Sequence, residues 1–362
     1  MTNLTDIAEK VESGARLNRE DGLALFASPD ILEVGRLANI VRERKNADRA
    51  YYIINRHINY SNICVNRCRF CAFSRNRGEA GAYEMAMSEI LSRTDEAARI
   101  GASEIHIVGG LHPALPFEFY ASMLREIRAR HPKIHLQAFT AVEIAHIAKI
   151  AGITVEEALI ALREAGLGSL PGGGAEVFSP RVRKELCKDK LSGEDWLAVM
   201  RTAHRLGIRS NATMLYGHVE TAEEKVEHML RLRELQDETG GFMSFIPLAF
   251  HPKNTDIARP GTTGVEDLKH LAVGRLILDN FDHVKAFWIM LGLKMAQVSL
   301  SFGVDDIDGT VVEEKITHMA GAQTPEGVTV AELERLIHEA GRTPVERDTL
   351  YNVITKNQTK GV

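Results

Sequence analysis

A regular alternation of apolar, strand-like segments with amphipathic helical segments constrains the fold of this chain more than any other feature. Helical patterns separate most of the strand-like segments, and several end on glycine, a common C-terminal stop. The eight predicted strands are "HINYSNI" (57–63), "EIHIVGG" (104–110), "IHLQAFT" (134–140), "LGSLPGG" (167–173), "SNATMLYG" (210–217), "FMSFIPLAF" (242–250), "VKAFWIML" (284–291) and "VSLSFGV" (298–304). Strands that alternate with helices favour a parallel sheet joined by right-handed crossovers.

The number of strands, together with a length of 362 residues, predicts an α/β fold of the (β/α)8 TIM-barrel type. An open, doubly wound sheet is the main alternative. Residues 1–50 are predicted to form an N-terminal helical extension, 51–310 the barrel, and 311–362 a C-terminal helical extension. We expect both extensions to pack on the outside of the barrel or over one of its ends.

Charge and terminal sequence argue against several classes of protein. The formal net charge is -5 and no basic tract is present, which does not suggest a nucleic-acid partner. No apolar run approaches the ~20 residues that a membrane span needs, and "MTNLTDIAEKVESG" lacks the apolar core of a signal peptide. We therefore expect a cytoplasmic protein with no membrane partner, in which thiols stay reduced and clustered cysteines more often bind metal or act in catalysis.

Three of the four cysteines, Cys64, Cys68 and Cys71, form a C-x3-C-x2-C motif directly after the first predicted strand. In a parallel barrel this is the face where catalytic loops gather. A structural zinc site normally has four Cys or His ligands, and His57 lies too far back along an extended strand. A [4Fe–4S] cluster with one open iron, a zinc site and free thiols all remain possible interpretations. Cys187 is expected to pack as a small apolar residue rather than as a fourth ligand.

The motif, with Phe70 before the third cysteine, resembles the signature of radical S-adenosylmethionine (SAM) enzymes. The resemblance implies a radical SAM barrel whose three cysteines hold a [4Fe–4S] cluster. It also implies that SAM binds at the open iron and is cleaved to methionine and a 5′-deoxyadenosyl radical. An electron donor such as flavodoxin or ferredoxin is then needed as a partner.

Several residues at the ends of the other predicted strands are candidates for binding the cofactor. The resemblance implies that Gly109 and Gly110 hold the amino group of SAM, although a plain strand-to-loop turn would also use glycine. Glu176 follows the costly glycine run "PGGG" and is expected to face the ribose or amino group of SAM; a solvated loop glutamate is the alternative. Gln137 and Asn211, on the third and fifth predicted strands, complete the expected cofactor-binding set.

The resemblance covers roughly residues 50–325 and narrows to the menaquinone-pathway branch of this superfamily. The shared segments include "PGGGAE", "ATMLYGHVE", "LQDETGGF" and "FGVDD". This branch includes aminofutalosine synthase, dehypoxanthine futalosine cyclase and one half of the deazaflavin synthase. "RCRFCAF" and "IPLAFHPKNT" are most similar to the synthase group, with the cyclase as the alternative. A non-enzymatic iron–sulfur electron carrier is a third hypothesis, which the polar strand ends argue against.

The synthase resemblance implies an adenosyl-group transfer to the small molecule 3-[(1-carboxyvinyl)oxy]benzoate, giving 6-amino-6-deoxyfutalosine. This substrate carries two carboxylates, and removing a carboxylate from water is costly without paired donors. We therefore predict that cationic or strong donor groups line the site. His218, His251 and Arg75 are the catalytic candidates, and Lys253 is a further possible donor.

Overall fold

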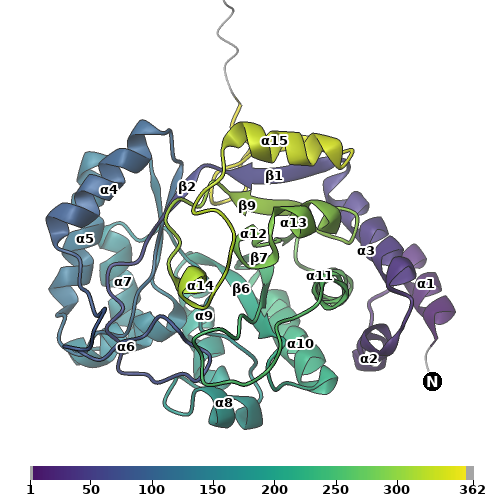
Figure 1. The fold of residues 1–362 in the computed structure, drawn as a ribbon, viewed down its shortest axis with the longest axis horizontal. Helices are drawn as coiled ribbons and strands as arrows, with labels where there is room; N and C mark the ends of the chain where they lie inside the picture. The colour runs from purple at the N-terminus through teal and green to yellow at the C-terminus, as the bar shows by residue number, and fades with distance from the viewer. Residues whose placement is uncertain (1–2, 356–362) are drawn as a thin grey trace, which may run out of the picture.

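Parallel strands form the centre of the molecule in the computed structural model, which describes residues 3–355 (Figure 1). Within these residues the main sheet has seven strands, each parallel to its neighbours and all in chain order. They are β2 (Asn55–Ile58), β3 (Glu104–Ile107), β4 (His135–Ala138), β5 (Ser169–Leu170), β6 (Arg209–Tyr216), β7 (Phe242–Ala249) and β8 (His283–Val284). The predicted α/β class with a parallel, TIM-type sheet is confirmed.

A second, smaller sheet connects the two edges of the main one. In the described part of the chain it contains three parallel strands in the order β10-β1-β9. Their bounds are β1 (Arg49–Ile53), β9 (Asp306–Gly309) and β10 (Thr343–Glu346). Isolated parallel bridges join Asp306 to Lys285, beyond β8, and Val312 to Arg56 in β2. The segment 306–312 therefore spans the gap between the first and last strands of a partial barrel.

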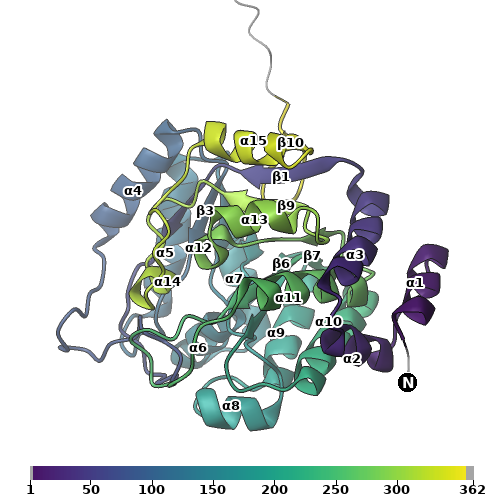
Figure 2. The same ribbon diagram turned by 45° about the vertical axis from the view of Figure 1, so that its right-hand side comes forward.

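Helices cover the outside of the sheet (Figures 1 and 2). The helices up to β6 are α1 (Leu4–Ser13), α2 (Arg19–Ala27), α3 (Ile31–Asn46), α4 (Met87–Arg99), α5 (Phe117–Arg130), α6 (Ala141–Ala151), α7 (Val155–Ala165), α8 (Pro180–Leu186) and α9 (Gly193–Arg205). Those after β6 are α10 (Ala222–Thr239), α11 (Gly264–Ile277), α12 (Trp288–Leu291), α13 (Leu293–Ser299), α14 (Ile316–Met319) and α15 (Val330–Glu339). Helix α3 packs on α11, and α15 covers β9 and β10.

Several of these helices begin with the same local device, a capping box. The threonine side chain accepts the N–H of the third helical residue, and the glutamate at that position accepts the N–H of the threonine. The pairs are Thr140 with Glu143 in α6, Thr154 with Glu157 in α7, Thr221 with Glu224 in α10 and Thr263 with Glu266 in α11. Each box fixes the residue at which its helix starts.

The last two predicted strands need correction. The prediction of a strand at 298–304 is wrong, because α13 continues to Ser299 and a turn follows it before β9. The preceding residues, "LKMAQ", are mostly good helix formers, and the Ser299 hydroxyl donates to the Ala296 carbonyl at 2.6 Å inside the helix. The predicted strand 284–291 is strand only at its start and becomes α12 from Trp288. Strands β1, β9 and β10 were not predicted.

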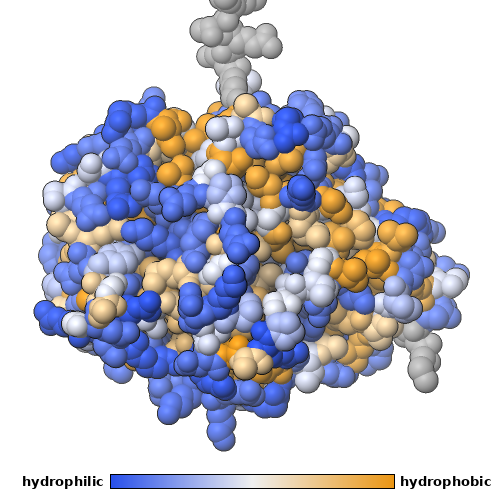
Figure 3. All heavy atoms as spheres, in the orientation of Figure 1, coloured by the Kyte–Doolittle hydropathy of each residue, from blue (hydrophilic) through white to orange (hydrophobic). Residues whose placement is uncertain are grey.

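The apolar core lies between the main sheet and its helices, with a second cluster beneath α15 that includes Tyr52, Ile307 and Leu333. Hydrophilic residues cover most of the face in Figure 3, with smaller apolar areas among them. Across residues 3–355, no helix combines the length and apolar character needed to cross a bilayer. Residues 1–2 and 356–362, which belong to the predicted terminal extensions, lie outside the described residues.

Candidate active site

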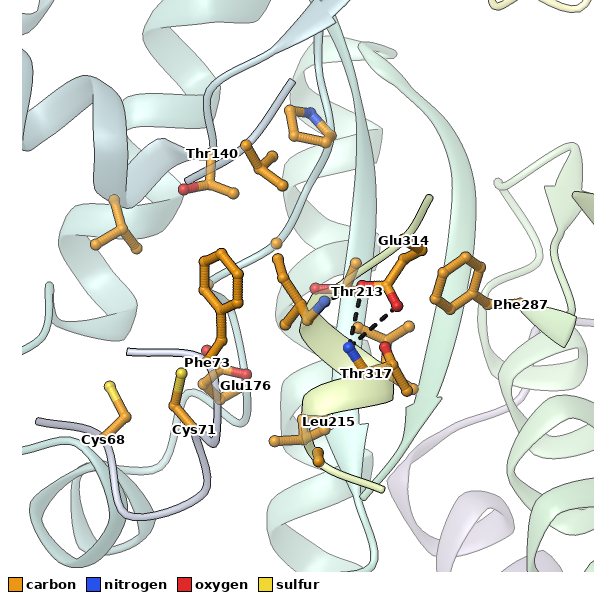
Figure 4. A pocket seen from close by; sticks show the side chains of 18 of the residues that line it. Cys68, Cys71, Phe73, Thr140, Glu176, Thr213, Leu215, Phe287, Glu314 and Thr317 are labelled. Atoms are coloured by element: carbon orange, nitrogen blue, oxygen red, sulfur yellow. Dashed lines mark hydrogen bonds between the residues drawn. The ribbon is translucent and has the colours of Figure 1, made fainter. Parts of the chain in front are cut away.

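A cavity of about 320 Å³ opens at the carboxyl ends of the parallel strands and reaches into the barrel (Figure 4). Its walls come from β2 and the loop after it, from β3 to β7 and the residues that follow them, and from β9 with the segments on either side of it. Glu314 and Thr317 lie beside it, and the Glu314 carboxylate accepts the Thr317 N–H at 3.0 Å, which caps α14. The predicted site residues that line this cavity are Cys64, Cys68, Cys71, Gly109, Gly110, Gln137, Glu176, Asn211 and His251.

The three clustered cysteines lie on one loop that runs from β2 to α4, here called the cysteine loop (residues 59–86). Backbone hydrogen bonds hold this loop against its neighbours: the N–H of Cys64 donates to Arg75 at 3.1 Å, and that of Arg69 donates to Leu186 at 2.8 Å. Cys64, Cys68 and Cys71 are all partly exposed to the cavity. The structure therefore brings the three predicted thiols to the same wall.

The chemistry of these thiols fits an iron–sulfur cluster. Burial raises the pKa of Cys64 and Cys71, and a hydrogen bond with the Cys187 thiol is the largest cause of the raised pKa of Cys68. No three His, Cys, Asp or Glu side chains of residues 3–355 are grouped to hold a metal ion. In a [4Fe–4S] cluster each thiolate binds a different iron, so its ligands surround a larger group than one ion.

Cys187 lies closer to this site than the sequence indicated. It follows α8 and is buried, as predicted. Its side chain nevertheless hydrogen-bonds to Cys68, and the backbone bond from Arg69 to Leu186 fixes the end of α8 beside the cysteine loop. Cys68 and Cys187 are more than a hundred residues apart in the sequence, so no local pattern predicted this contact.

Gly109 and Gly110 follow β3 and meet the start of the cysteine loop. A Cβ at Gly110 would lie 2.4 Å from the Ile63 carbonyl oxygen, and one at Gly109 would lie 2.6 Å from the Tyr60 ring. Glycine is thus required here for packing against protein, whatever ligand approaches from the cavity. The Gly109 N–H donates to the Glu143 carboxylate at 2.9 Å, so a buried acid holds this segment in place.

Glu143 is a cavity residue that the sequence analysis did not single out. One carboxylate oxygen accepts the Gly109 N–H and the Tyr60 hydroxyl, both at 2.9 Å. The other accepts the N–H and hydroxyl of Thr140 at 2.8 and 2.9 Å. Burial raises the pKa of Glu143, whereas these four donors favour its ionised form. The T-x-x-E capping pattern was readable in the sequence, but its role beneath Gly109 was not.

Glu176 lines the cavity in a conformation that is costly for a residue with a side chain. Its φ is 48°, in the left-handed region, where such strain typically marks functional positions. The Lys190 ammonium lies 2.5 Å from its carboxylate. Burial alone would raise the pKa of Glu176, but Lys190 outweighs it and the pKa is lowered. Lys190 also lies over the Phe70 ring at 5.3 Å, and no spacing rule pointed to it.

Gln137 and Asn211 face the same interior and contact one another. The Asn211 amide donates to the Gln137 side-chain oxygen at 3.5 Å, and the Ser244 hydroxyl donates to Asn211 at 2.9 Å. Gln137 in turn donates to the Ser169 hydroxyl at 3.3 Å. The two amides therefore belong to a fixed chain of hydrogen bonds across the barrel.

Two of the three predicted catalytic side chains lie outside the cavity wall. His218 is fully buried, with its ring bonded to the Leu215 carbonyl at 2.9 Å and paired with Glu220 at 2.8 Å. Arg75 donates to the carbonyls of Ala72 and Ser74, both at 2.8 Å. His251 does line the cavity, where its ring bonds the Met290 carbonyl at 3.0 Å.

Comparison with known proteins places this architecture in a class. The model of the Radical SAM superfamily matches residues 58–232, and that of the CofH/MqnC C-terminal region matches 239–360. Among solved structures, the FeFe-hydrogenase maturase of Carboxydothermus hydrogenoformans (17% identity, 96% of this chain and 80% of that one) and methylornithine synthase (16%, 93% and 97%) share the fold, each with a TM-score of 0.75.

Relatives with similar sequences show which family within this superfamily the chain belongs to. The aminodeoxyfutalosine synthase of Thermus thermophilus is 51% identical over 97% of this chain and 96% of its own length, and that of Streptomyces coelicolor is 45% identical over 96% and 93%. The 5-amino-6-(D-ribitylamino)uracil–L-tyrosine 4-hydroxyphenyl transferase of Methanopyrus kandleri is 41% identical over 96% and 95%. The chain belongs to the radical SAM superfamily, which uses a [4Fe–4S] cluster and SAM, and within it to the family of the aminodeoxyfutalosine synthases.

Proposed function

We propose that this protein has the activity of an aminodeoxyfutalosine synthase and acts in menaquinone biosynthesis. The reaction joins the 5′-deoxyadenosyl group of SAM to 3-[(1-carboxyvinyl)oxy]benzoate and yields 6-amino-6-deoxyfutalosine, methionine and bicarbonate. The observation that carries the proposal is the 51% identity to the Thermus thermophilus synthase over 97% of the chain. The depth of the cavity beneath the cysteine loop supports it, because a cavity that reaches into the barrel can hold a radical away from bulk water and side reactions.

The cofactors would occupy the outer part of the cavity. Cys64, Cys68 and Cys71 would hold the [4Fe–4S] cluster, which when bound supplies the electron that cleaves SAM. Gly109 and Gly110 would bind the amino group of SAM with their backbone. Each of these positions lines the same wall, and a flavodoxin or ferredoxin in the cytoplasm would act as reductant.

Other residues would hold this arrangement in place. Glu176, fixed by Lys190, would accept a hydrogen bond from SAM, and Gln137 and Asn211 would support its inner side. His251 is retained as the catalytic candidate that faces the cavity. Arg75, whose side chain bonds backbone carbonyls near Cys71, would brace the cysteine loop.

A second function deserves a test because of the tyrosine-dependent relatives. The Methanopyrus kandleri protein, at 41% identity, transfers the 4-hydroxyphenyl group of tyrosine. The related cyclase reaction on dehypoxanthine futalosine would instead release 5′-deoxyadenosine. These three reactions give products of different mass from the same cofactor.

The experiment is anaerobic turnover of the reconstituted enzyme with dithionite, SAM labelled in the adenosyl group, and each acceptor in turn. The proposal expects label in a product larger than 5′-deoxyadenosine, formed only with the enolpyruvyl benzoate. A Cys68→Ala variant serves as the cluster-free control. Product formation with tyrosine and the ribitylaminouracil, or stoichiometric 5′-deoxyadenosine from dehypoxanthine futalosine, would identify one of the other reactions.

A further inference from the structure

A layer of polar side chains crosses the barrel below the cysteine loop. Barrel interiors are ordinarily filled by layers of branched apolar residues, so a polar layer at this depth needs a reason. We call it the polar ring; its members, all lining the cavity, are His57, His106, Gln137, Asn211, Lys285 and Asp308. Except for the half-buried His106, each is at least nine-tenths buried.

Strand register builds the first part of this ring. His57 of β2 pairs in register with His106 of β3, which pairs with Gln137 of β4. Neighbours in register on parallel strands point to the same side of the sheet, and the side chains of His106 and Gln137 hydrogen-bond to each other. The ring of His57 forms no hydrogen bond within the described residues, so its nitrogens face the cavity without a partner.

Lys285 supplies the positive charge of the polar ring. Of the Lys and Arg side chains in residues 3–355, only Lys190 and Lys285 line the cavity. Lys190 is bound to Glu176 at the cysteine end. The Lys285 ammonium donates to Asp308 at 3.1 Å, which uses one of its three N–H groups and leaves two for a ligand.

A flat aromatic surface adjoins this cation. The ring of His57 stacks on His106 at 4.4 Å and 9°, and Phe287 lies parallel to His57 at 6.3 Å and 8°. Phe287 also lines the cavity, on the side opposite Cys68 and Cys71 in Figure 4. At this end of the cavity, the aromatic side chains could contact a planar ring of a ligand, and the Lys285 ammonium could bind a carboxylate on that ring.

The chemistry of the acceptor, 3-[(1-carboxyvinyl)oxy]benzoate, determines which of its two ends faces the cysteine loop. The enol-ether double bond accepts the radical, so it must lie near the cofactor, at the cysteine loop. The carboxylate that is bonded to this double bond lies there with it. The carboxylate on the benzene ring is at the far end of the molecule. We propose, on the basis of the proposed function, that the polar ring binds this aromatic carboxylate through Lys285 and so directs the enol-ether end toward the cysteine loop.

Two acidic side chains of the cavity, Asp308 and Glu104, lie within electrostatic range of Lys285. Burial raises the pKa of Asp308, and the Lys285 ammonium offsets this effect only in part. Burial would also raise the pKa of Glu104, but Lys285 and His106 outweigh it, so that Glu104 stays ionised. Arg347, which is buried and bound to Asp306 at 2.6 Å, also lowers the pKa of Glu104.

The test compares two acceptors that differ only in the aromatic carboxylate. Anaerobic calorimetry measures binding of 3-[(1-carboxyvinyl)oxy]benzoate and of 2-phenoxyacrylate, which lacks that group, to the SAM-loaded holoenzyme. A charged hydrogen bond of ordinary strength predicts that the wild type prefers the benzoate by about ten- to hundredfold. In Lys285→Met the preference should fall below about threefold, and Lys285→Arg should restore part of it.

Controls keep the outcome decisive. Lys294→Met removes the same charge from an exposed lysine outside the cavity and should keep the wild-type preference. If Lys285→Met folds poorly, as its cluster absorption would show, Lys285→Met/Asp308→Asn removes both charges of the buried pair. A wild-type preference in either folded variant overturns the inference. Failure of the wild-type enzyme to form product from the benzoate, by contrast, overturns the proposed function.

Discussion

Glu143→Gln is the substitution that most directly tests how the cofactor segment is held. The carboxylate accepts two donors on each oxygen, and one donor on each side is a backbone N–H, from Gly109 and from Thr140. Glutamine has the same shape, but its NH2 group must replace one of these oxygens. On either side the hydroxyl of Tyr60 or Thr140 can rotate to accept the new N–H, whereas the backbone N–H is left without an acceptor.

The expected size of the effect follows from the one backbone N–H group that loses its acceptor. A buried donor without a partner costs about 1–3 kcal/mol, so the opening free energy of the affected amide should fall by that amount. Since about 1.4 kcal/mol corresponds to a tenfold change, amide hydrogen exchange at Gly109 or Thr140 should accelerate about five- to hundredfold. Exchange measured by mass spectrometry on peptides covering residues 104–111 and 139–145 reports both.

The chain supplies its own control. Glu157 makes the same capping box with Thr154, with both bonds at 2.8 Å, but on the exposed surface of α7. Water can replace its contacts, so Glu157→Gln should leave the exchange at Gly109 unchanged. Wild-type protection of both Gly109 and Thr140 in Glu143→Gln would refute the reasoning.

Three further outcomes are expected. Burial lowers the pKa of His204 to about 4, so the unfolded chain protonates first as the pH falls; this side chain should account for about 1.4 kcal/mol of the unfolding free energy lost between pH 8 and pH 5.5, and the loss measured by chemical denaturation should be smaller by that amount in His204→Gln. Gly110→Ala should lose the cluster absorption, because its Cβ would meet the Ile63 carbonyl at 2.4 Å, whereas Gly173→Ala, which meets only the Thr140 methyl at 3.1 Å, should keep it. Cys187→Ala should retain the cluster and SAM cleavage that Cys68→Ala loses; loss in both would make Cys187 a ligand.

Local patterns predicted the parts of the structure that depend on local physics. Strand and helix periodicity gave the parallel sheet, and the spacing of Cys64, Cys68 and Cys71 placed three thiols on one loop at its active face. The alternation in "VSLSFGV" misled because a helix from the preceding residues runs into it. Lys285 was hidden inside a predicted strand, since only its place in the cavity wall and its hydrogen bond to Asp308 show which way it faces.

The catalytic candidates show the same difference between what local sequence predicts and what distant contacts decide. His218 and Arg75 follow predicted strands or lie in the cysteine loop, so their position along the chain was suitable. Their direction depends on partners such as Glu220 and the Ala72 carbonyl, which no periodicity encodes. Lys190 and Glu143 show the converse, because their importance comes from contacts with residues distant in sequence.

The pairing of β1 has a consequence for how the chain is made. Arg49 lies beside Thr343 and Tyr51 beside Asp306, so β1 leaves the ribosome long before either neighbour exists. Both of its edges then stay open during synthesis, and such distant pairings form slowly. Ribosome-stalled chains that stop before residue 300 should therefore be cut by protease near β1, while release of the full chain should bring protection.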